Sequence, residues 1–237
     1  MQVTQMELIF LNSITPGDHI WGIPLKAPKA EMRKELYQET IEGLVRKRLL
    51  KSENQLSILG ATAAKQVDDY KRSQKYVLLN RLHIAMLPEL GCVTIVPTEQ
   101  GSTEVAHADT AMHNQMGAAR NMQERGSYEI LRQNRAAILL KILRSYEELC
   151  AGGKELDLDS LCSFDHFVEE LNNYPCSMLL GKYDSNRSIE EGVLYWDKQK
   201  IYYFDVKREK KRRMSAPQVR NFLADILELR EGGTRNE

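Results

Sequence analysis

The sequence predicts an α+β fold in which a central antiparallel sheet is flanked by helices. The hydrophobic pattern changes from helical spacing to strand-like runs near residue 76, and again near residue 177. The elements before and after these runs follow the same order in both parts of the chain: helix, helix, strands, helix. We therefore expect a single domain over 1–237, built from two quasi-symmetric halves of about 1–124 and about 125–237 that share one sheet.

The first half is expected to begin with helices. Thr4 and Glu7 have the T-x-x-E spacing of a capping box, which predicts a short helix to about Ser13. The segment "DHIWGIPLKAP" is expected to be extended, because glycine and prolines interrupt it. Two further helices are expected over 29–51 and about 56–74. The apolar stripe of the second comprises Leu59, Ala63, Val67 and Tyr70.

Strands and two more helices are expected to complete the first half and open the second. "YVLLNRLHIAML" and "CVTIVP", on either side of the turn "PELG", are typical of two strands in one hairpin. Residues 108–123 have a weak helical pattern. Residues 128–150 have a stronger one, which Gly152 and Gly153 end.

The second half is expected to repeat this plan. A helix near 164–173 leads into the strand "CSMLLGKYD", and then into a hairpin over 193–206 with the turn "DKQK". Ser215 and Gln218 form an S-x-x-Q capping box with a proline in the first turn, which predicts a helix over about 216–230. Its apolar positions are Val219, Phe222, Leu223, Ile226 and Leu227.

The hairpin over 193–206 has two apolar faces. With the turn at "DKQK", one face carries Val193, Tyr195, Tyr202, Phe204 and Val206, and the other carries Leu194, Trp196, Ile201 and Tyr203. We expect the chain's own helices to cover one face, and either more of the chain or a partner to cover the other.

Trp196 and Tyr203 are the first candidates for partner contacts, followed by Leu194 and Ile201, because Trp and Tyr are enriched at binding surfaces. Packing of the strand between two helical layers is the alternative. The first-half strands contribute lower-ranked candidates, namely Ile84, Met86, Val93 and Ile95.

A dense basic run follows the hairpin, in which six of the seven residues from Lys207 to Arg213 are Lys or Arg. Such a run is a candidate nucleic-acid site. However, Lys plus Arg and Asp plus Glu both total 33, whereas a nucleic-acid-binding protein usually carries a basic excess. A capping box comes next, so we expect the run to form the end of a strand and the connector into a helix. Charge at such a place keeps a sheet edge solvated. Nucleic-acid binding through 207–213 remains the alternative function.

The sequence contains none of the catalytic templates for phosphate loops, dinucleotide folds, nucleophile elbows or zinc proteases. Two partial metal sets, His107 with Asp109 and His113, and Cys162 with His166 and Cys176, lack a complete ligand arrangement. We therefore expect no enzyme activity, no cofactor, no metal and no small-molecule substrate. The chain has no signal-like start, no run of about 20 apolar residues and no paired cysteines. These features predict a cytoplasmic protein without membrane insertion.

The first half resembles a known family in its pattern. "TQMELIFLNSITPGDHIWGIP", "LVRKRLLKSENQLS" and "YVLLNRLHIAMLPELGCVTIVP" combine a short helix, an x-G-[IL]-P segment, an amphipathic helix and a tyrosine-led strand pair. In these features the chain resembles the EspG-type chaperones of type VII (ESX) secretion, especially their firmicute members. The second half resembles them in element order only.

This resemblance implies a cytoplasmic, non-enzymatic chaperone or adaptor without a cofactor, in which two quasi-symmetric halves surround an antiparallel sheet. Its partner would be a helical-hairpin secretion substrate, which the chaperone keeps soluble and ready for export.

Overall fold

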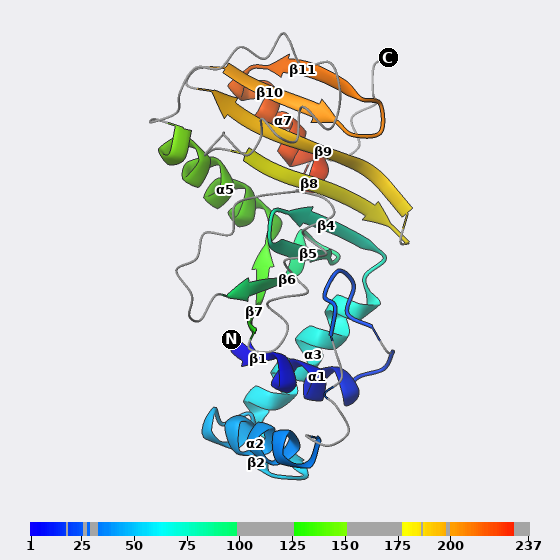
Figure 1. The fold of residues 1–237 in the computed structure, drawn as a ribbon, viewed down its shortest axis with the longest axis vertical. Helices are drawn as coiled ribbons and strands as arrows, with labels where there is room; N and C mark the ends of the chain where they lie inside the picture. Colours follow the sequence, from blue (N-terminus) through cyan, green and yellow to red (C-terminus); the bar gives the residue numbers. More distant parts are fainter. Residues whose placement is uncertain are drawn as a thin grey trace.

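The computed structural model describes residues 1–17, 19–25, 28, 33–98, 126–150, 177–185, 187–197 and 200–229. Within this part of the chain, one open antiparallel sheet has the strand order β1-β7-β6-β5-β4-β8-β9-β10-β11 (Figure 1). Its strands are β1 (Gln2–Thr4), β4 (Lys75–Leu79), β5 (Leu82–Met86), β6 (Gly91–Thr98), β7 (Ser127–Asn134), β8 (Ser177–Asp184), β9 (Arg187–Asp197), β10 (Lys200–Asp205) and β11 (Lys210–Met214).

Helices and one small hairpin surround the sheet. The helices are α1 (Gln5–Ser13), α2 (Arg33–Arg46), α3 (Ile58–Arg72), α5 (Arg135–Cys150) and α7 (Ala216–Ile226), and the hairpin pairs β2 (Leu50–Ser52) with β3 (Gln55–Leu56). These elements confirm the α+β class with a central antiparallel sheet flanked by helices. None of the described helices is long and apolar enough to cross a membrane.

β4 pairs with β8 in the middle of the sheet, and Tyr76 faces Tyr183 across this pairing, which we call the seam. From the seam, β5, β6 and β7 extend in one direction and β9, β10 and β11 in the other. α5 directly follows β7 and α7 follows β11, so each side of the seam has strands followed by a helix. β7 and α5 were assigned to the second half from the sequence, but β7 pairs with β1 and β6 of the first half. The helices expected over 108–123 and 164–173 lie outside the described residues.

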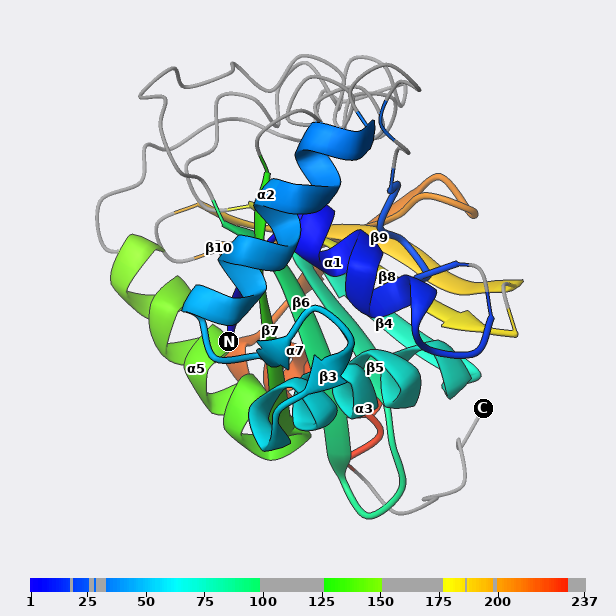
Figure 2. The same ribbon diagram turned by 90° about the horizontal axis from the view of Figure 1, so that it is seen from below.

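The main core has two layers, one on each side of the sheet. α1, α2 and α3 pack on one side, where buried residues such as Leu8, Leu44 and Val67 meet Val93 and Ile130 of the sheet. α5 and α7 pack on the other side. In Figure 2 these two groups of helices flank the strands β6 and β7. The buried residues of the second layer include Ile138, Leu139, Val219, Leu223 and Ile226.

The strand pattern near residue 80 differs from the prediction. "YVLLNRLHIAML" forms two strands, β4 and β5, because the chain reverses at Asn80, whose φ is +52°. Asparagine adopts this left-handed conformation more readily than most residues. Asn80 also exchanges hydrogen bonds with β8, since its N–H donates to the Leu179 carbonyl and its Oδ1 accepts from the Leu179 N–H. The first half therefore has three strands here instead of two.

The prediction of one helix over 128–150 is wrong for its first part, because Ser127–Asn134 forms β7 and the helix begins at Arg135. Tyr128 and Ile130 are buried and their neighbours less so, which is the period of a strand lying between β1 and β6. The Asn134 side chain accepts a hydrogen bond from the Ala136 N–H and so caps the helix.

Both predicted capping boxes are present, at Thr4 with Glu7 and at Ser215 with Gln218. The helix predicted over 29–51 ends earlier, at Arg46. There the Leu49 N–H bonds to the Leu44 carbonyl and Arg48 has a φ of +60°, the geometry of a Schellman motif.

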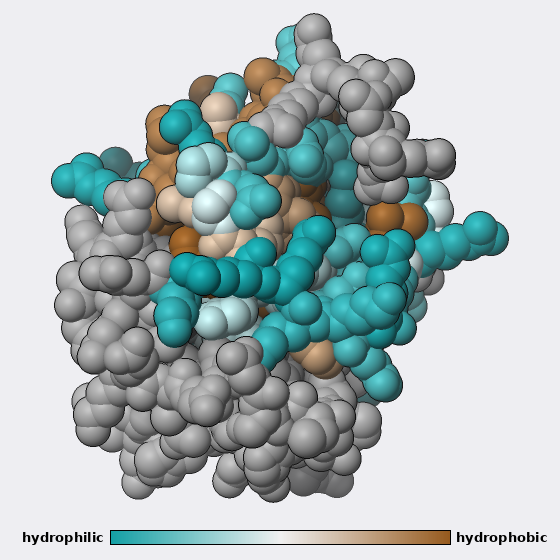
Figure 3. Space-filling model, turned by 90° about the horizontal axis from the view of Figure 1, so that it is seen from above, coloured by the Kyte–Doolittle hydropathy of each residue, from teal (hydrophilic) through white to brown (hydrophobic). Residues whose placement is uncertain are grey.

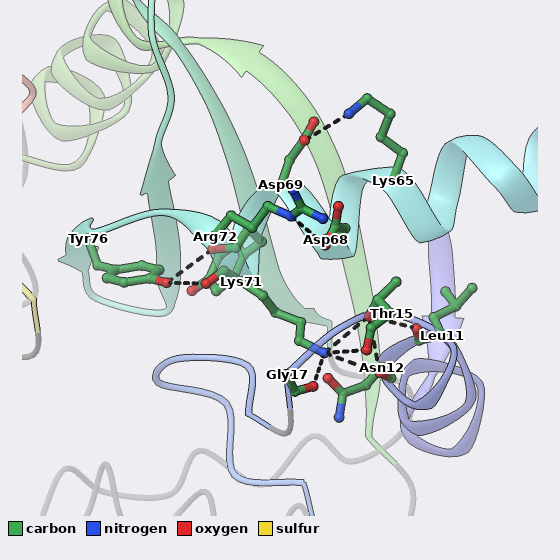
Figure 4. A network of polar contacts seen from close by, with 11 residues as sticks. Leu11, Asn12, Thr15, Gly17, Lys65, Asp68, Asp69, Lys71, Arg72 and Tyr76 are labelled. Carbon is green, nitrogen blue, oxygen red and sulfur yellow. Dashed lines mark hydrogen bonds and ion pairs between the residues drawn. The ribbon is translucent and has the colours of Figure 1, made fainter.

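Lys71 of α3 fixes the end of α1 (Figure 4). Its ammonium donates to the carbonyls of Asn12 and Thr15, at 3.2 and 3.1 Å, and to the carbonyl of Gly17. A helix end has carbonyls without intrahelical partners, and a lysine there satisfies them. α1 and α3 are thereby joined on one side of the sheet.

Candidate functional site

The aromatic hairpin of β9 and β10 has the register that the sequence predicted. Trp196 faces Ile201, Tyr195 faces Tyr202, Leu194 faces Tyr203 and Val193 faces Phe204. Side chains therefore alternate between the two sides of the sheet as expected. The two sides have different surroundings.

The side that carries the predicted contact residues is covered by the chain's own helix α7. Leu194 is 0% exposed and Tyr203 is 1% exposed, and Ile201 is partly buried against the same core. The ring of Phe222 lies 4.7 Å from the ring of Tyr203. Leu194 and Tyr203 thus offer a partner no surface in this structure, and α7 occupies the place that the partner hypothesis assigned to another protein. Trp196 lies in β9, and its side chain is outside the described atoms.

The lower-ranked candidates are also buried. Ile84, Val93 and Ile95 are each 0% exposed and Met86 is 8% exposed. Ile84 and Met86 face α5 and α7, whereas Val93 and Ile95 face α1 and α3. Alternating apolar residues in a strand are typical of both a binding face and a core face. The helices that pack on them decide which one it is.

Tyr203 is held by polar contacts as well as by packing. Its hydroxyl donates a 2.5 Å hydrogen bond to the Glu190 carboxylate, and the Arg212 guanidinium lies 5.0 Å from its ring centroid. Burial, and then the hydrogen bond to Glu190, raise the pKa of Tyr203 well above its usual value, so the hydroxyl remains a donor. The ring lies so close to Gly192 that a Cβ there would be 2.4 Å from it.

The opposite side of the hairpin carries a third apolar cluster, which we call the tyrosine face. Its buried members are Val193, Tyr195 and Phe204, and its partly buried members are Leu179, Tyr202 and Val206. Tyr195 and Tyr202 stack with ring centroids 5.4 Å apart and an interplanar angle of 14°. All of the described members come from β8, β9, β10 and the turn that follows, so the partly buried ones place apolar and aromatic surface on this side of the sheet.

A second aromatic cluster lies at the seam on the same side. Trp21 stacks on Tyr76 at 4.6 Å and contacts Tyr183 at 4.8 Å, and the Tyr70 hydroxyl donates to the Trp21 carbonyl. His83 packs edge-on to Trp21, at 6.4 Å. Burial lowers the pKa of His83 to about 4, so its imidazole is neutral at physiological pH. The sequence indicated an extended segment at Trp21 but not that it covers the seam.

The basic run forms a turn and the edge strand β11, rather than only a connector. β11 pairs with β10 from Lys210 to Met214, which ends the described sheet on this side. Lys211 lies over the ring of Tyr202, at 5.5 Å. Figure 3 views this end of the molecule, where hydrophilic residues cover much of the described surface beside hydrophobic ones. Charged side chains on an edge strand oppose pairing with other sheets.

A charged cluster lies across the seam at the end of α7. The Glu228 carboxylate lies 3.0 Å from both the Lys75 and the Lys182 ammonium groups and 3.8 Å from the Arg135 guanidinium. Burial acts to raise the pKa of Glu228, but the hydrogen bonds from Lys75 and Lys182 outweigh it, so the net effect is a lowered pKa. These contacts join α7 to strands of both halves.

The described residues contain no candidate metal site, because no three His, Cys, Asp or Glu side chains among them are grouped to hold an ion. Both partial sets from the sequence, at 107–113 and 162–176, lie outside those residues.

Comparison with known proteins adds one match. Residues 2–105 match a family model described as a domain of unknown function (DUF5081). This segment includes β1 to β6, and therefore the helices α1, α2 and α3 of one layer and the sheet strands β1, β4, β5 and β6. No curated protein matches the chain.

Proposed function

We propose that the protein is a non-enzymatic, cytoplasmic chaperone or adaptor of a type VII secretion system. It binds a helical-hairpin substrate and keeps that substrate soluble and export-competent. The resemblance of the first half to EspG-type chaperones motivates the secretion role. The tyrosine face is the observation that supports protein binding.

The tyrosine face suits a helical partner in its composition and position. Leu179, Tyr202 and Val206 are partly exposed beside three buried apolar residues. Tyrosine buries a large area and keeps a polar hydroxyl for the rim of an interface. Lys211 lies at the margin of this surface, where a charged residue contributes solubility and orientation rather than most of the affinity. We therefore transfer the contact hypothesis from Leu194 and Tyr203 to Tyr202, Leu179 and Val206.

Co-expression with small helical proteins from the same locus, followed by size-exclusion chromatography, tests this proposal. A substrate should co-elute in a stoichiometric complex that survives nuclease and loses little affinity with added salt. Tyr202→Asp or Val206→Asp should abolish co-elution. Leu140→Asp, at a 62% exposed leucine on the outer surface of α5, is the matched control and should leave it intact. The proposal fails if no helical protein co-elutes, or if the control weakens the complex as much.

The rival function is nucleic-acid binding through 207–213. It predicts a steep loss of affinity with salt and weaker binding when Lys210, Lys211, Arg212 and Arg213 are all changed to Ala. Two of these cations have aromatic partners within the chain, since Arg212 lies over Tyr203 and Lys211 over Tyr202. Titration of the protein with a duplex and a single-stranded oligonucleotide at two salt concentrations separates the two functions.

A further inference from the structure

Three apolar side chains are exposed together at the start of α3, at the end of the molecule opposite β11 (Figure 1). Leu56 is 36%, Ile58 is 84% and Leu59 is 57% exposed. We call these three residues the apolar tip. The sequence placed Leu59 on the core stripe of its helix, but the inward positions are Gly60, Ala63, Val67 and Tyr70.

The backbone holds the apolar tip in a defined shape. The Ser57 hydroxyl accepts from the Gly60 N–H as N-cap and donates to the Arg48 carbonyl at 2.6 Å, and the Ser57 N–H donates to the Leu49 carbonyl. A Cβ at Gly60 would lie 3.1 Å from Leu56 Cδ2, so the leucine packs directly over the first turn of α3. A surface fixed in this way loses little conformational entropy when it binds.

The core does not require apolar residues at these positions. Ile58 and Leu59 occupy the first two residues of α3, where acidic or polar residues are favoured and where the sequence has no acid. Single exposed hydrophobic residues are common, but contiguous ones on a rigid element are typical of interaction sites.

The surroundings of the apolar tip are basic. Arg46, Arg48 and Lys51 are exposed on the segments that lead into it, and none of the ion pairs among the described residues includes them. Lys47 is paired with Glu7, and the exposed acids nearby are Glu53 in the β2–β3 turn and Glu42, one turn before Arg46 in α2. The N-terminus of α3 adds the positive end of its helix dipole. The apolar tip therefore lies beside more basic than acidic exposed side chains.

We propose that the apolar tip is a second docking site, separate from the tyrosine face, for an amphipathic helix of another protein whose apolar stripe is flanked by Asp and Glu. Leucine-sized side chains of that helix pack around Ile58 and Leu59, and its carboxylates face Arg46, Arg48 and Lys51. Like charges around both tips oppose a symmetric dimer of this chain. A polynucleotide has the negative charge that suits these basic residues, but it has no aliphatic stripe to pack against the apolar tip.

Two synthetic amphipathic peptides of about 18 residues test this docking site. They share a leucine stripe and differ only in having Glu or Lys beside it. In fluorescence anisotropy with the full chain, the Glu peptide should bind about tenfold or more tightly than the Lys peptide, and its affinity should fall as salt is added. The double variant Ile58→Glu, Leu59→Glu should lose this binding, whereas Leu140→Glu on α5 should retain it. Equal thermal midpoints of the two variants show that folding is not the cause.

Charge reversal gives an independent readout. Arg46→Glu with Lys51→Glu should shift the preference toward the Lys peptide, whereas Arg220→Glu on α7 should not. Equal binding of both peptides, or wild-type binding by the Ile58→Glu, Leu59→Glu variant, overturns the proposal. A concentration-dependent dimer that this variant dissolves, or an oligonucleotide that competes at the tip, assigns the site to a second copy or to nucleic acid instead. Tyrosine-face variants should bind the Glu peptide normally, so the secretion-chaperone proposal and this one fail separately.

Discussion

Tyr203→Ala distinguishes a core residue from a partner contact. The side chain is 1% exposed and packs against Phe222. Truncation of a buried aromatic residue to alanine costs about 3–5 kcal/mol, because contacts are lost and a cavity remains. The hydrogen bond to Glu190 also disappears, but Glu190 is partly exposed and water can replace the donor. We therefore expect a loss of about 4 kcal/mol in the free energy of unfolding.

Tyr203→Phe separates the packing contribution from the polar one. It keeps the ring against Phe222 and removes only the hydroxyl that donates to Glu190. A hydrogen bond to a charged group contributes about 1.5–3 kcal/mol when buried, and partial exposure of the acceptor places this one near the lower end. Tyr203→Phe should thus cost about 1.5 kcal/mol, less than half the cost of the alanine variant.

Urea-induced unfolding followed by circular dichroism measures both losses. Tyr202→Ala is the matched control, since this neighbouring tyrosine lies on the other side of the sheet and is only partly buried. It should cost about 1–2 kcal/mol. If Tyr203→Ala stays within about 1 kcal/mol of the wild type but removes substrate binding, the assignment of Tyr203 to the core is refuted.

Three further perturbations test other parts of the structure. The pKa of His83 is about 4 in the folded state, below the ordinary 6.5, so the folded state binds fewer protons. Stability should be full above pH 6.5 and fall by up to about 3 kcal/mol as the pH drops to 4, and His83→Leu should flatten this part of the urea-midpoint profile. Gly60→Ala should destabilise by about 2 kcal/mol or more, because the new Cβ would lie 1.9 Å from the Leu49 carbonyl oxygen; an increase in melting temperature, which is usual for Gly→Ala in a helix, would contradict the close contact. Ser215→Ala should cost about 1 kcal/mol by removing the α7 cap, and Ser215→Thr should restore most of it in the same thermal assay.

Much of the second half follows from local sequence patterns. The register of β9 with β10 matches the prediction, because the pairing of Asp197 with Lys200 fixes which residues face each other along both strands. The start of α7 is also as predicted, since the S-x-x-Q box with its proline satisfies the first free N–H groups without help from distant residues. The secondary-structure prediction was wrong where one local pattern is compatible with both a helix and a strand. Residues 128–134 contain apolar positions that suit a helix, and they form a strand because β1 and β6 provide partners on both sides.

The sequence by itself determined the fold class, the capped helix starts, the hairpin register and the apolar character of both hairpin faces. These properties depend on neighbouring residues and on backbone geometry. Only the tertiary structure decided which apolar face α7 covers and which face keeps partly exposed side chains. α7 buries Leu194 and Tyr203, although nothing local distinguishes them from Tyr202. Likewise Leu59 has the spacing of a core residue, but the close packing of the β2–β3 hairpin on Gly60 turns it outward with Ile58. Burial depends on elements that are distant in the sequence, and periodicity does not encode their positions.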